Sequence, residues 1–379
     1  MTINNKNKKA NVPNLRFPEF QGEWEKCKLG DYGKVVTGNT PPTKDIENYE
    51  NGTYLWASPA DLGIIKSITE TKTMLSAQGF SKTRTLPKGS VLVTCIGSTI
   101  GKAGMATKEM STNQQINSIV VNDNNDNEFV YYAIQSAFPR YLSSIAVQAV
   151  PIISKSAFEL LPNNRPYLQE QKKIGKFLSL LDERIAAQNK IIDKLQSLIK
   201  GLRASLMQIE NGNIVHLGEI AQIYQPQTIS STELTEDGFL VYGANGIIGK
   251  YKQYNHKTEQ ICITCRGNTC GMVNYTKPMS WITGNAMVIN TDEHQNKVCK
   301  RYLYHYLSAY NFYSIISGSG QPQIVRTPLE QLKVPLPTFL EQKQKATFLD
   351  KIQGKIEISN KTFNLYLQQK QYLLRQMFI

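Results

Sequence analysis

The sequence of 379 residues contains one pattern twice, with the second copy about 170 residues after the first. The segment Val93–Gly101 (VTCIGSTIG) returns as Ile263–Gly271 (ITCRGNTCG), and Asn117–Asn122 returns as Asn285–Asn290. Further matches keep the same order along both copies. We therefore expect two folding units of one architecture, because a duplicated pattern has to bury its apolar residues in the same way each time.

Each copy ends with the pattern of a long helix. Pro166–Lys172 matches Pro337–Lys343, and a proline closely followed by glutamate is typical of a first helical turn. Apolar residues then alternate at spacings of three and four, which predicts a heptad seam. The predicted seam residues are Leu178, Leu181, Ile185, Ile192, Leu195, Ile199 and Leu202 in the first copy and Leu349, Ile352, Ile356, Phe363, Tyr366 and Leu373 in the second.

The two helices need partners for these seams. Each helix would contain about forty residues and extend for roughly 60 Å at 1.5 Å per residue. We expect the helices to pair with each other as a coiled coil, since each seam is longer than one domain face needs. The alternative is that each helix packs only on its own domain as an ordinary amphipathic helix.

The residues before each helix predict a mixed α/β unit. Helices are expected over residues 128–141 and 300–312. The predicted fold class is therefore α+β, with two tandem units and two long helices. Short apolar runs bounded by turn residues predict strands at 54–57, 91–96 and 119–121 in the first copy and at 240–242, 261–265 and 287–289 in the second.

The stretch Val91–Met105 has the general look of a nucleotide-binding loop, because an apolar run leads into glycines and a lysine. A phosphate-binding loop has four residues between its first glycine and the Gly-Lys pair, followed by serine or threonine. Here three residues separate Gly97 from Gly101, and the second copy has Met272 in place of Lys102. We interpret the shared element as a strand and a tight turn, with a nucleotide hydrolase as the alternative.

Other catalytic or metal-binding patterns are weak. Cys262 and Cys265 have the spacing of two zinc ligands, but the four histidines are scattered, so we expect buried thiols. Asn39–Pro42 only faintly resembles the Asn-Pro-Pro-aromatic loop of adenine methyltransferases, because Thr43 replaces the aromatic residue that stacks on the flipped base. We expect a chain without catalytic activity, bound metal or bound cofactor.

The charge of the chain favours a polyanionic partner. Forty-three Lys and Arg residues against thirty Asp and Glu residues leave a formal net charge of +13, which favours nucleic acid. A generally basic protein without a particular partner is the alternative.

The N-terminus lacks the apolar centre of a signal peptide, and the sequence has no apolar run long enough to span a membrane. We therefore expect a cytoplasmic protein with no membrane partner.

Several further motifs occur in order along the chain, namely Val12–Phe20 with Gly22 and Trp24, Thr37–Pro42 (TGNTPP), Gly318–Ile324 (GSGQPQI) and the two Pro-x-x-x-Glu-Gln helix starts. Taken together, over essentially the whole chain, they resemble the specificity (S) subunit of bacterial type I restriction-modification enzymes. The first copy departs from this pattern, since residues 146–152 read AVQAVPI where the second copy keeps GSGQPQI, which weakens the case for an equivalent DNA contact there.

The resemblance implies a DNA-reading subunit that does not catalyse a reaction. Two target-recognition domains would each read one half of a bipartite, asymmetric site in double-stranded DNA. The long helices would lie antiparallel, relate the domains by a pseudo-two-fold axis and space the half-sites by one helical turn, roughly 34 to 36 Å. Two methyltransferase (M) subunits would dock on the helices, and two restriction (R) motor subunits would complete the enzyme. S-adenosylmethionine, ATP and Mg²⁺ would bind those partners.

These observations predict five segments. A flexible N-terminus covers residues 1–12, target-recognition domains cover residues 13–165 and 211–336, and conserved coiled-coil helices cover residues 166–210 and 337–379. The alternative from another functional class is a coiled-coil scaffold whose basic domains bind RNA or an acidic protein.

Base contacts are expected from loop residues with hydrogen-bonding side chains. We look for them in the glycine-containing turns and in the segment before each final strand, and for each residue the alternative is an ordinary solvated side chain. The candidates are Ser98, Thr99, Lys102, Gln148, Ser154 and Lys155 in the first copy and Arg266, Asn268, Thr269, Gln321, Gln323 and Arg326 in the second.

Overall fold

A computed structural model describes residues 11–63, 65–144, 152–208, 213–318 and 320–379. Most of the predicted flexible N-terminus, residues 1–10, lies outside this description. The chain divides into unit 1, which is residues 1–190 with 361–379, and unit 2, which is residues 191–360. Each long helix contributes residues to both units. No helix in the described ranges is long and apolar enough to cross a membrane.

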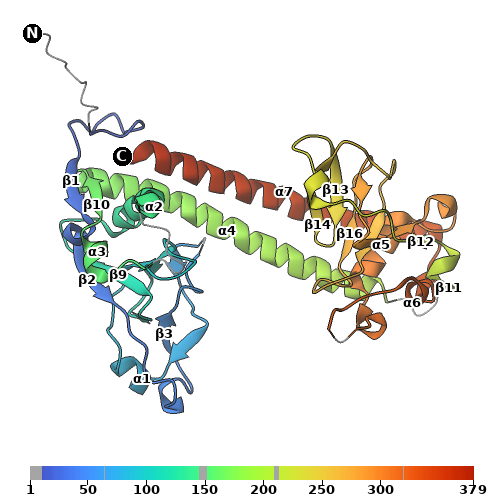
Figure 1. Ribbon diagram of the computed structural model, residues 1–379, viewed down its shortest axis with the longest axis horizontal. Helices are drawn as coiled ribbons and strands as arrows, with labels where there is room; N and C mark the ends of the chain where they lie inside the picture. Colours follow the sequence, from blue (N-terminus) through green and yellow to red (C-terminus); the bar gives the residue numbers. More distant parts are fainter. Residues whose placement is uncertain (1–10, 64, 145–151, 209–212, 319) are drawn as a thin grey trace, which may run out of the picture. The chain divides into compact units, whose positions relative to one another are not determined.

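The described part of unit 1 contains a five-stranded sheet and a three-stranded sheet, connected by segments that include the helices α1, α2 and α3 (Figure 1). The strand order is β2-β9-β6-β7-β4 in the larger sheet and β5-β3-β8 in the smaller one. A separate antiparallel pair, β1-β10, joins the two ends of the domain. The elements are β1 (Glu25–Lys28), η1 (Leu29–Tyr32), β2 (Gly33–Thr37), η2 (Ile46–Asn48), β3 (Tyr54–Ala57), β4 (Ser67–Ile68), β5 (Thr73–Leu75), α1 (Ala77–Ser81), β6 (Val91–Thr94), β7 (Ala103–Ala106), β8 (Ser111–Thr112), β9 (Ile116–Val121), α2 (Asn127–Ser144), α3 (Lys155–Glu159), β10 (Pro162–Arg165) and α4 (Leu168–Leu206).

Unit 2 repeats this plan. Its larger sheet has the order β12-β18-β15-β16, its smaller sheet has the order β14-β13-β17, and β11 pairs with β19. The elements are β11 (Asn213–His216), η3 (Leu217–Glu219), β12 (Gln222–Tyr224), η4 (Ser231–Glu233), β13 (Phe239–Gly243), β14 (Gly246–Tyr251), β15 (Ile261–Thr264), β16 (Val273–Tyr275), β17 (Trp281–Ile282), β18 (Ala286–Asn290), η5 (Asp292–His294), α5 (Lys300–Ala309), η6 (Phe312–Ile315), α6 (Arg326–Glu330), β19 (Lys333–Leu336) and α7 (Phe339–Met377).

The sheets of the two units correspond strand by strand, which confirms the internal repeat and the α+β class. Even the parallel pair inside each smaller sheet recurs, as β3 with β8 and as β13 with β17. Strand β4 is an addition to unit 1. The six predicted strands are present, and the helices predicted at 128–141 and 300–312 are α2 and α5.

The central strand of each larger sheet is covered on both faces, which explains its unbroken apolar run. Successive residues on a strand point to opposite faces. In β6, Val91 and Val93 pack in the apolar cluster that contains α2, whereas Leu92 packs in a second cluster with Leu55. In β15, Ile263 and Cys262 likewise belong to different clusters.

The shared Pro-x-x-x-Glu-Gln motif fastens each long helix to its domain. The buried Gln171 side chain donates to the Pro166 carbonyl at 2.9 Å and accepts from the backbone N–H of Asp126, just before α2, at 3.0 Å. In unit 2, Gln342 donates to the Pro337 carbonyl and accepts from the backbone N–H that precedes α5. The glutamine thus satisfies backbone groups near two helix starts at once.

The predicted seam residues are buried or half-buried, and the two helices pack together in opposite directions. In unit 1 the first half of α4, with Leu178, joins a cluster that contains Leu373 near the end of α7. In unit 2 the second half of α4, with Ile199, packs against Leu349 and Ile356 near the start of α7. The cluster in unit 1 also contains the α2 core, so the helices pair with each other and pack on a domain.

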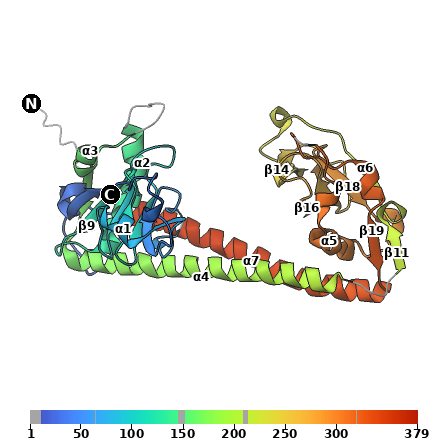
Figure 2. The same ribbon diagram turned by 90° about the horizontal axis from the view of Figure 1, so that it is seen from below.

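A buried polar contact joins the domain helix of each unit to a long helix. In unit 1 the Tyr132 hydroxyl of α2 donates to Asp182 of α4 at 2.6 Å. In unit 2, His305 Nε2 lies 2.8 Å from Asp350 of α7, and Arg203 Nε donates to His305 Nδ1 at 3.1 Å. Burial lowers the pKa of His305, so its ring is neutral and Nε2–H donates to Asp350. Figure 2 shows α5 beside α7.

Candidate nucleic-acid interface

The two predicted glycine-containing turns are the same structure built twice. In unit 1, Gly101 donates its N–H to Thr94 O at 2.9 Å, and in unit 2 Gly271 donates to Thr264 O at 2.9 Å. The remaining turn hydrogen bonds also correspond. All four glycines adopt a positive φ, between 86° and 94°, which L side chains rarely adopt. The glycines therefore fix the shape of the turn, and the intervening side chains are left to differ.

These turns lack the structural setting of a phosphate-binding loop. Such a loop runs from a strand into the N-terminus of a helix, where backbone N–H groups hold the phosphates. Here the chain leaves each turn as a strand that pairs antiparallel with the one before it, β7 with β6 and β16 with β15. The structure thus confirms the interpretation as a strand and a tight turn.

Substitution of Gly101 by alanine is expected to destabilise unit 1 by about 2–4 kcal/mol. The left-handed conformation costs about 1–2 kcal/mol, and an added Cβ would lie 2.6 Å from the Phe138 ring, which must move. Gly271→Ala is the matched control, because its Cβ would be 3.3 Å from Phe312, a contact that a shift of a few tenths of an ångström relieves, so the backbone cost of about 1–2 kcal/mol dominates. Hydrogen exchange of β6 and β15 in urea measures both effects, and equal losses would contradict the steric argument.

The second set of predicted residues lies directly beside each turn. Ile153 donates its N–H to Cys95 O at 2.8 Å, and Ile324 donates to Cys265 O at 3.0 Å. Arg266 also forms an antiparallel bridge with Gln323. The structure therefore brings together, in each unit, two segments that lie more than fifty residues apart in the sequence.

The predicted contact residues differ in how freely they can reach a partner. Thr99 and Thr269 are half-buried in their turns, and Thr269 donates to Asn245 at 2.6 Å. Lys155 and Arg326 begin short helices and pair with the glutamate four residues later. Gln148 lies outside the described residues. The exposed candidates are Ser98, Lys102, Ser154, Lys155, Arg266, Asn268, Gln321, Gln323 and Arg326.

Polar loop residues that were not predicted as contacts complete the same surface. In unit 1, Thr40 Oγ1 is 2.5 Å from Gln114 Oε1, and the side chain of Gln115 lies 3.9 Å from the position of a Cβ on Gly97. In unit 2, Asn245 reaches the turn through Thr269. The Thr37–Pro42 motif could have indicated from the sequence the loop that contains Thr40. This loop lies beside the turn because β2, which precedes it, pairs with β9.

The three clustered cysteines of unit 2 do not converge on one point. Cys262 packs in the cluster between the two sheets, whereas Cys265 and Cys270 belong to the cluster on the opposite face of β15. Burial raises the pKa of Cys262 to about 12, which disfavours the thiolate that a metal would require. These thiols pack as small apolar side chains.

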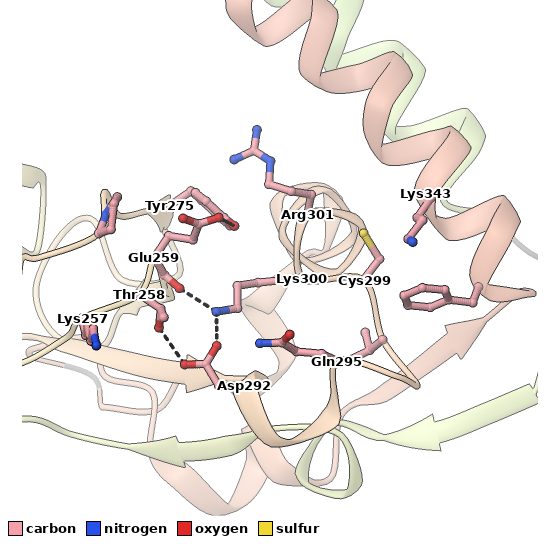
Figure 3. Close-up of a pocket in the computed structure, with 13 residues that line it drawn as sticks. Lys257, Thr258, Glu259, Tyr275, Asp292, Gln295, Cys299, Lys300, Arg301 and Lys343 are labelled. Carbon is pink, nitrogen blue, oxygen red and sulfur yellow. Dashed lines mark hydrogen bonds and ion pairs between the residues drawn. The ribbon is translucent and has the colours of Figure 1, made fainter.

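A cavity of about 560 Å³ in unit 2 is lined by several charged side chains that pair with their neighbours (Figure 3). Lys300 donates to Asp292 and to the Glu259 carbonyl, each at 2.6 Å, and Thr258 donates to Asp292 at 2.7 Å. Arg301 donates to Asp350 at 2.9 Å. These contacts hold the start of α5 in place and are distinct from the turn surface.

Comparison with known proteins gives a consistent family. A model of the type I restriction modification DNA specificity domain matches the chain twice, over residues 21–197 and 210–365. The type I restriction enzyme MjaVIII specificity subunit of Methanocaldococcus jannaschii is 25% identical over 400 residues, covering 92% of this chain and 89% of that protein. The EcoprrI specificity subunit of Escherichia coli is 23% identical and covers 87% of each chain.

Solved structures share the fold. A crystal structure of a type I restriction-modification system S subunit from M. genitalium matches with a TM-score of 0.68 at 19% identity, covering 97% of this chain and 99% of that one. A chain from a structural study of complex assembly and conformational transition of the type I R-M system matches with a TM-score of 0.52 at 17% identity, covering 94% and 97%.

Proposed function

The chain belongs to the family of type I restriction modification DNA specificity domains, and from this membership we propose that it selects the DNA site of a methyltransferase and endonuclease without catalysing a reaction itself. In this proposal the domains at 13–165 and 211–336 each read one half of a bipartite site. The observation that carries the proposal is the pair of turn surfaces, which share a backbone and differ in their exposed side chains.

Two domains that read different half-sites need the same backbone arrangement and different exposed side chains. The common backbone presents side chains to each half-site in the same way, while the side chains determine which base edges they can bond. At equivalent turn positions unit 1 carries Ser98 and Lys102, and unit 2 carries Asn268 and Met272. The two domains therefore offer different donors and acceptors, which suits an asymmetric site. The formal charge of +13 adds affinity for phosphates without regard to sequence.

Each long helix has, apart from its buried seam, exposed apolar residues that suit a helical partner. Ile191 and Leu198 of α4 are exposed and seven residues apart, and Leu365 and Tyr372 of α7 have the same spacing. Residues seven positions apart lie on the same face of a helix, so each pair offers two apolar anchors to a partner helix. We assign the exposed residues of each helix to the docking of a methyltransferase subunit, two in all. Two restriction subunits would join them, and those partners would bind S-adenosylmethionine, ATP and Mg²⁺.

Replacing Ile191 and Leu198 with serine is expected to weaken methyltransferase binding about thirtyfold or more, because central apolar anchors contribute about 2 kcal/mol or more to interfaces. The chain itself should keep its stability, since both side chains are exposed. Ile214→Ser is the control, because Ile214 is also apolar and exposed but lies on β11. Co-purification and titration calorimetry with the methyltransferase measure the effect. Equal binding by the control and the double variant would contradict this docking site.

The proposed function is tested by mixing the purified chain with S-adenosylmethionine and duplex DNA, with and without the methyltransferase subunit. We expect no methyl transfer by the chain alone and adenine methylation at a bipartite site when both proteins are present. Methylation by the chain alone would refute the non-catalytic assignment. Tighter binding to RNA than to any duplex DNA would favour the scaffold alternative.

A further inference from the structure

Unit 2 has a tight hairpin that has no counterpart in the described residues of unit 1. Strands β13 and β14 are joined directly, with Gly246 at a φ of 90°, and β14 is an edge strand. In unit 1 the strand that pairs with β3, β5, begins only at Thr73, after a long connection. The hairpin is therefore a feature by which the two domains differ.

The tip of this hairpin is attached to the glycine-containing turn of unit 2. Thr269 of the turn donates to Asn245 at 2.6 Å, and Thr264 Oγ1 donates to the Ala244 carbonyl. A Cβ on Gly246 would lie 3.7 Å from Asn274 Oδ1 on β16. The hairpin tip thus lies on the same surface as the candidate base contacts Arg266 and Asn268.

Two apolar side chains, Ile247 and Met272, are exposed beside the hairpin tip. Tyr242 and Cys262 pack in one cluster, so the two sheets face each other through these residues. Ile247 pairs with Tyr242 and Asn274 pairs with Cys262, and cross-strand partners share a face. Met272 is two residues before Asn274 and points to the same face. Ile247 and Met272 therefore lie at the open edge between the sheets, with 55% and 46% of their surfaces exposed.

We propose that Ile247, flanked by Met272, contacts the 5-methyl group of a thymine in the half-site that unit 2 reads. An exposed branched aliphatic side chain beside hydrogen-bonding residues is suited to this group, which is the apolar feature of an A·T pair in the major groove. The equivalent of Met272 in unit 1 is Lys102, an ammonium that favours guanine acceptors or phosphate. This proposal rests on the proposed DNA-reading function.

The test removes the methyl group from the DNA and the isoleucine from the protein. Each thymine in the half-site assigned to unit 2 is replaced in turn by uracil, which lacks only the methyl group. Binding of the methyltransferase-containing complex to each duplex is then measured for the natural chain and for Ile247→Ser. Ile248→Ser is the matched control, because Ile248 is also exposed but packs over Gly243 on the opposite strand face.

At one position we expect uracil to weaken binding of the natural complex about fourfold, the effect of burying one methyl group. The Ile247→Ser complex should bind both duplexes equally, and the Ile248→Ser complex should still discriminate. The proposal is overturned if Ile247→Ser keeps the full discrimination, or if no uracil in that half-site affects the natural complex. A complex that methylates no bipartite site at all would refute the DNA-reading function together with this proposal.

Discussion

Replacing Lys370 with methionine is expected to lower the free energy of unfolding of unit 1 by about 3–5 kcal/mol, the usual cost of leaving one partner of a buried ion pair behind. Lys370 Nζ of α7 lies 2.8 Å from Asp182 of α4, and both side chains are buried. The ammonium also lies over the rings of Tyr131 and Tyr132 of α2. Without it, the Asp182 carboxylate stays buried with the Tyr132 hydroxyl as its hydrogen-bond donor.

The double variant Asp182→Leu/Lys370→Met separates the lost charge from the lost packing. We expect it to regain most of the stability, because replacing a buried pair by apolar residues is often nearly neutral. A loss of about 1–3 kcal/mol should remain, since the Tyr132 hydroxyl then has no acceptor. Lys155→Met is the surface control, with an expected loss below about 0.5 kcal/mol. Hydrogen exchange of residues 361–377 in urea measures the free energy of unfolding of unit 1 in all three variants. If Lys370→Met were as stable as the natural chain, the ion pair would not stabilise unit 1 as described.

The repeat and the helices could be predicted because their signals are local and occur twice. The glycines of both turns adopt positive φ values, and α4 and α7 extend through the last predicted seam residues, Leu202 and Leu373, to end at Leu206 and Met377. Strands β6 and β15 were predictable because their apolar runs are covered on both faces. The glycines, the apolar seam residues and the apolar strand residues are recognisable in the sequence, and the structure needs these same residue types at the turns, the helix seam and the core.

The remaining contacts depend on tertiary pairing, which leaves little trace in one sequence. Strand β1 (EKCK) pairs with β10 (PNNR) through backbone hydrogen bonds, although neither segment has a hydrophobic alternation. The partner of Lys370 is Asp182, which lies 188 positions earlier and next to the predicted seam residue Leu181. The contact between Asn245 and Thr269 likewise requires the two sheets to be in place. The individual base contacts remain a prediction.

Exchange of residues 211–336 for the corresponding domain of a related specificity subunit is expected to replace one half of the methylated site completely. The exchange leaves the turn surface of unit 1 and the paired helices α4 and α7 unchanged, so the other half-site and the spacer should persist. Each altered base pair in a site typically costs about 1–3 kcal/mol, so several changes together abolish recognition of the original half-site. The reciprocal exchange of residues 13–165 is the matched control and should change only the other half.

Sequencing of methylated adenines in cells that express either exchanged chain with the methyltransferase measures this most directly. We expect a bipartite site in which residues 211–336 determine one half, residues 13–165 determine the other, and the spacer is the same in both chains. A site that changes in both halves after one exchange, or in neither half, would contradict the claim that each domain reads its own half-site.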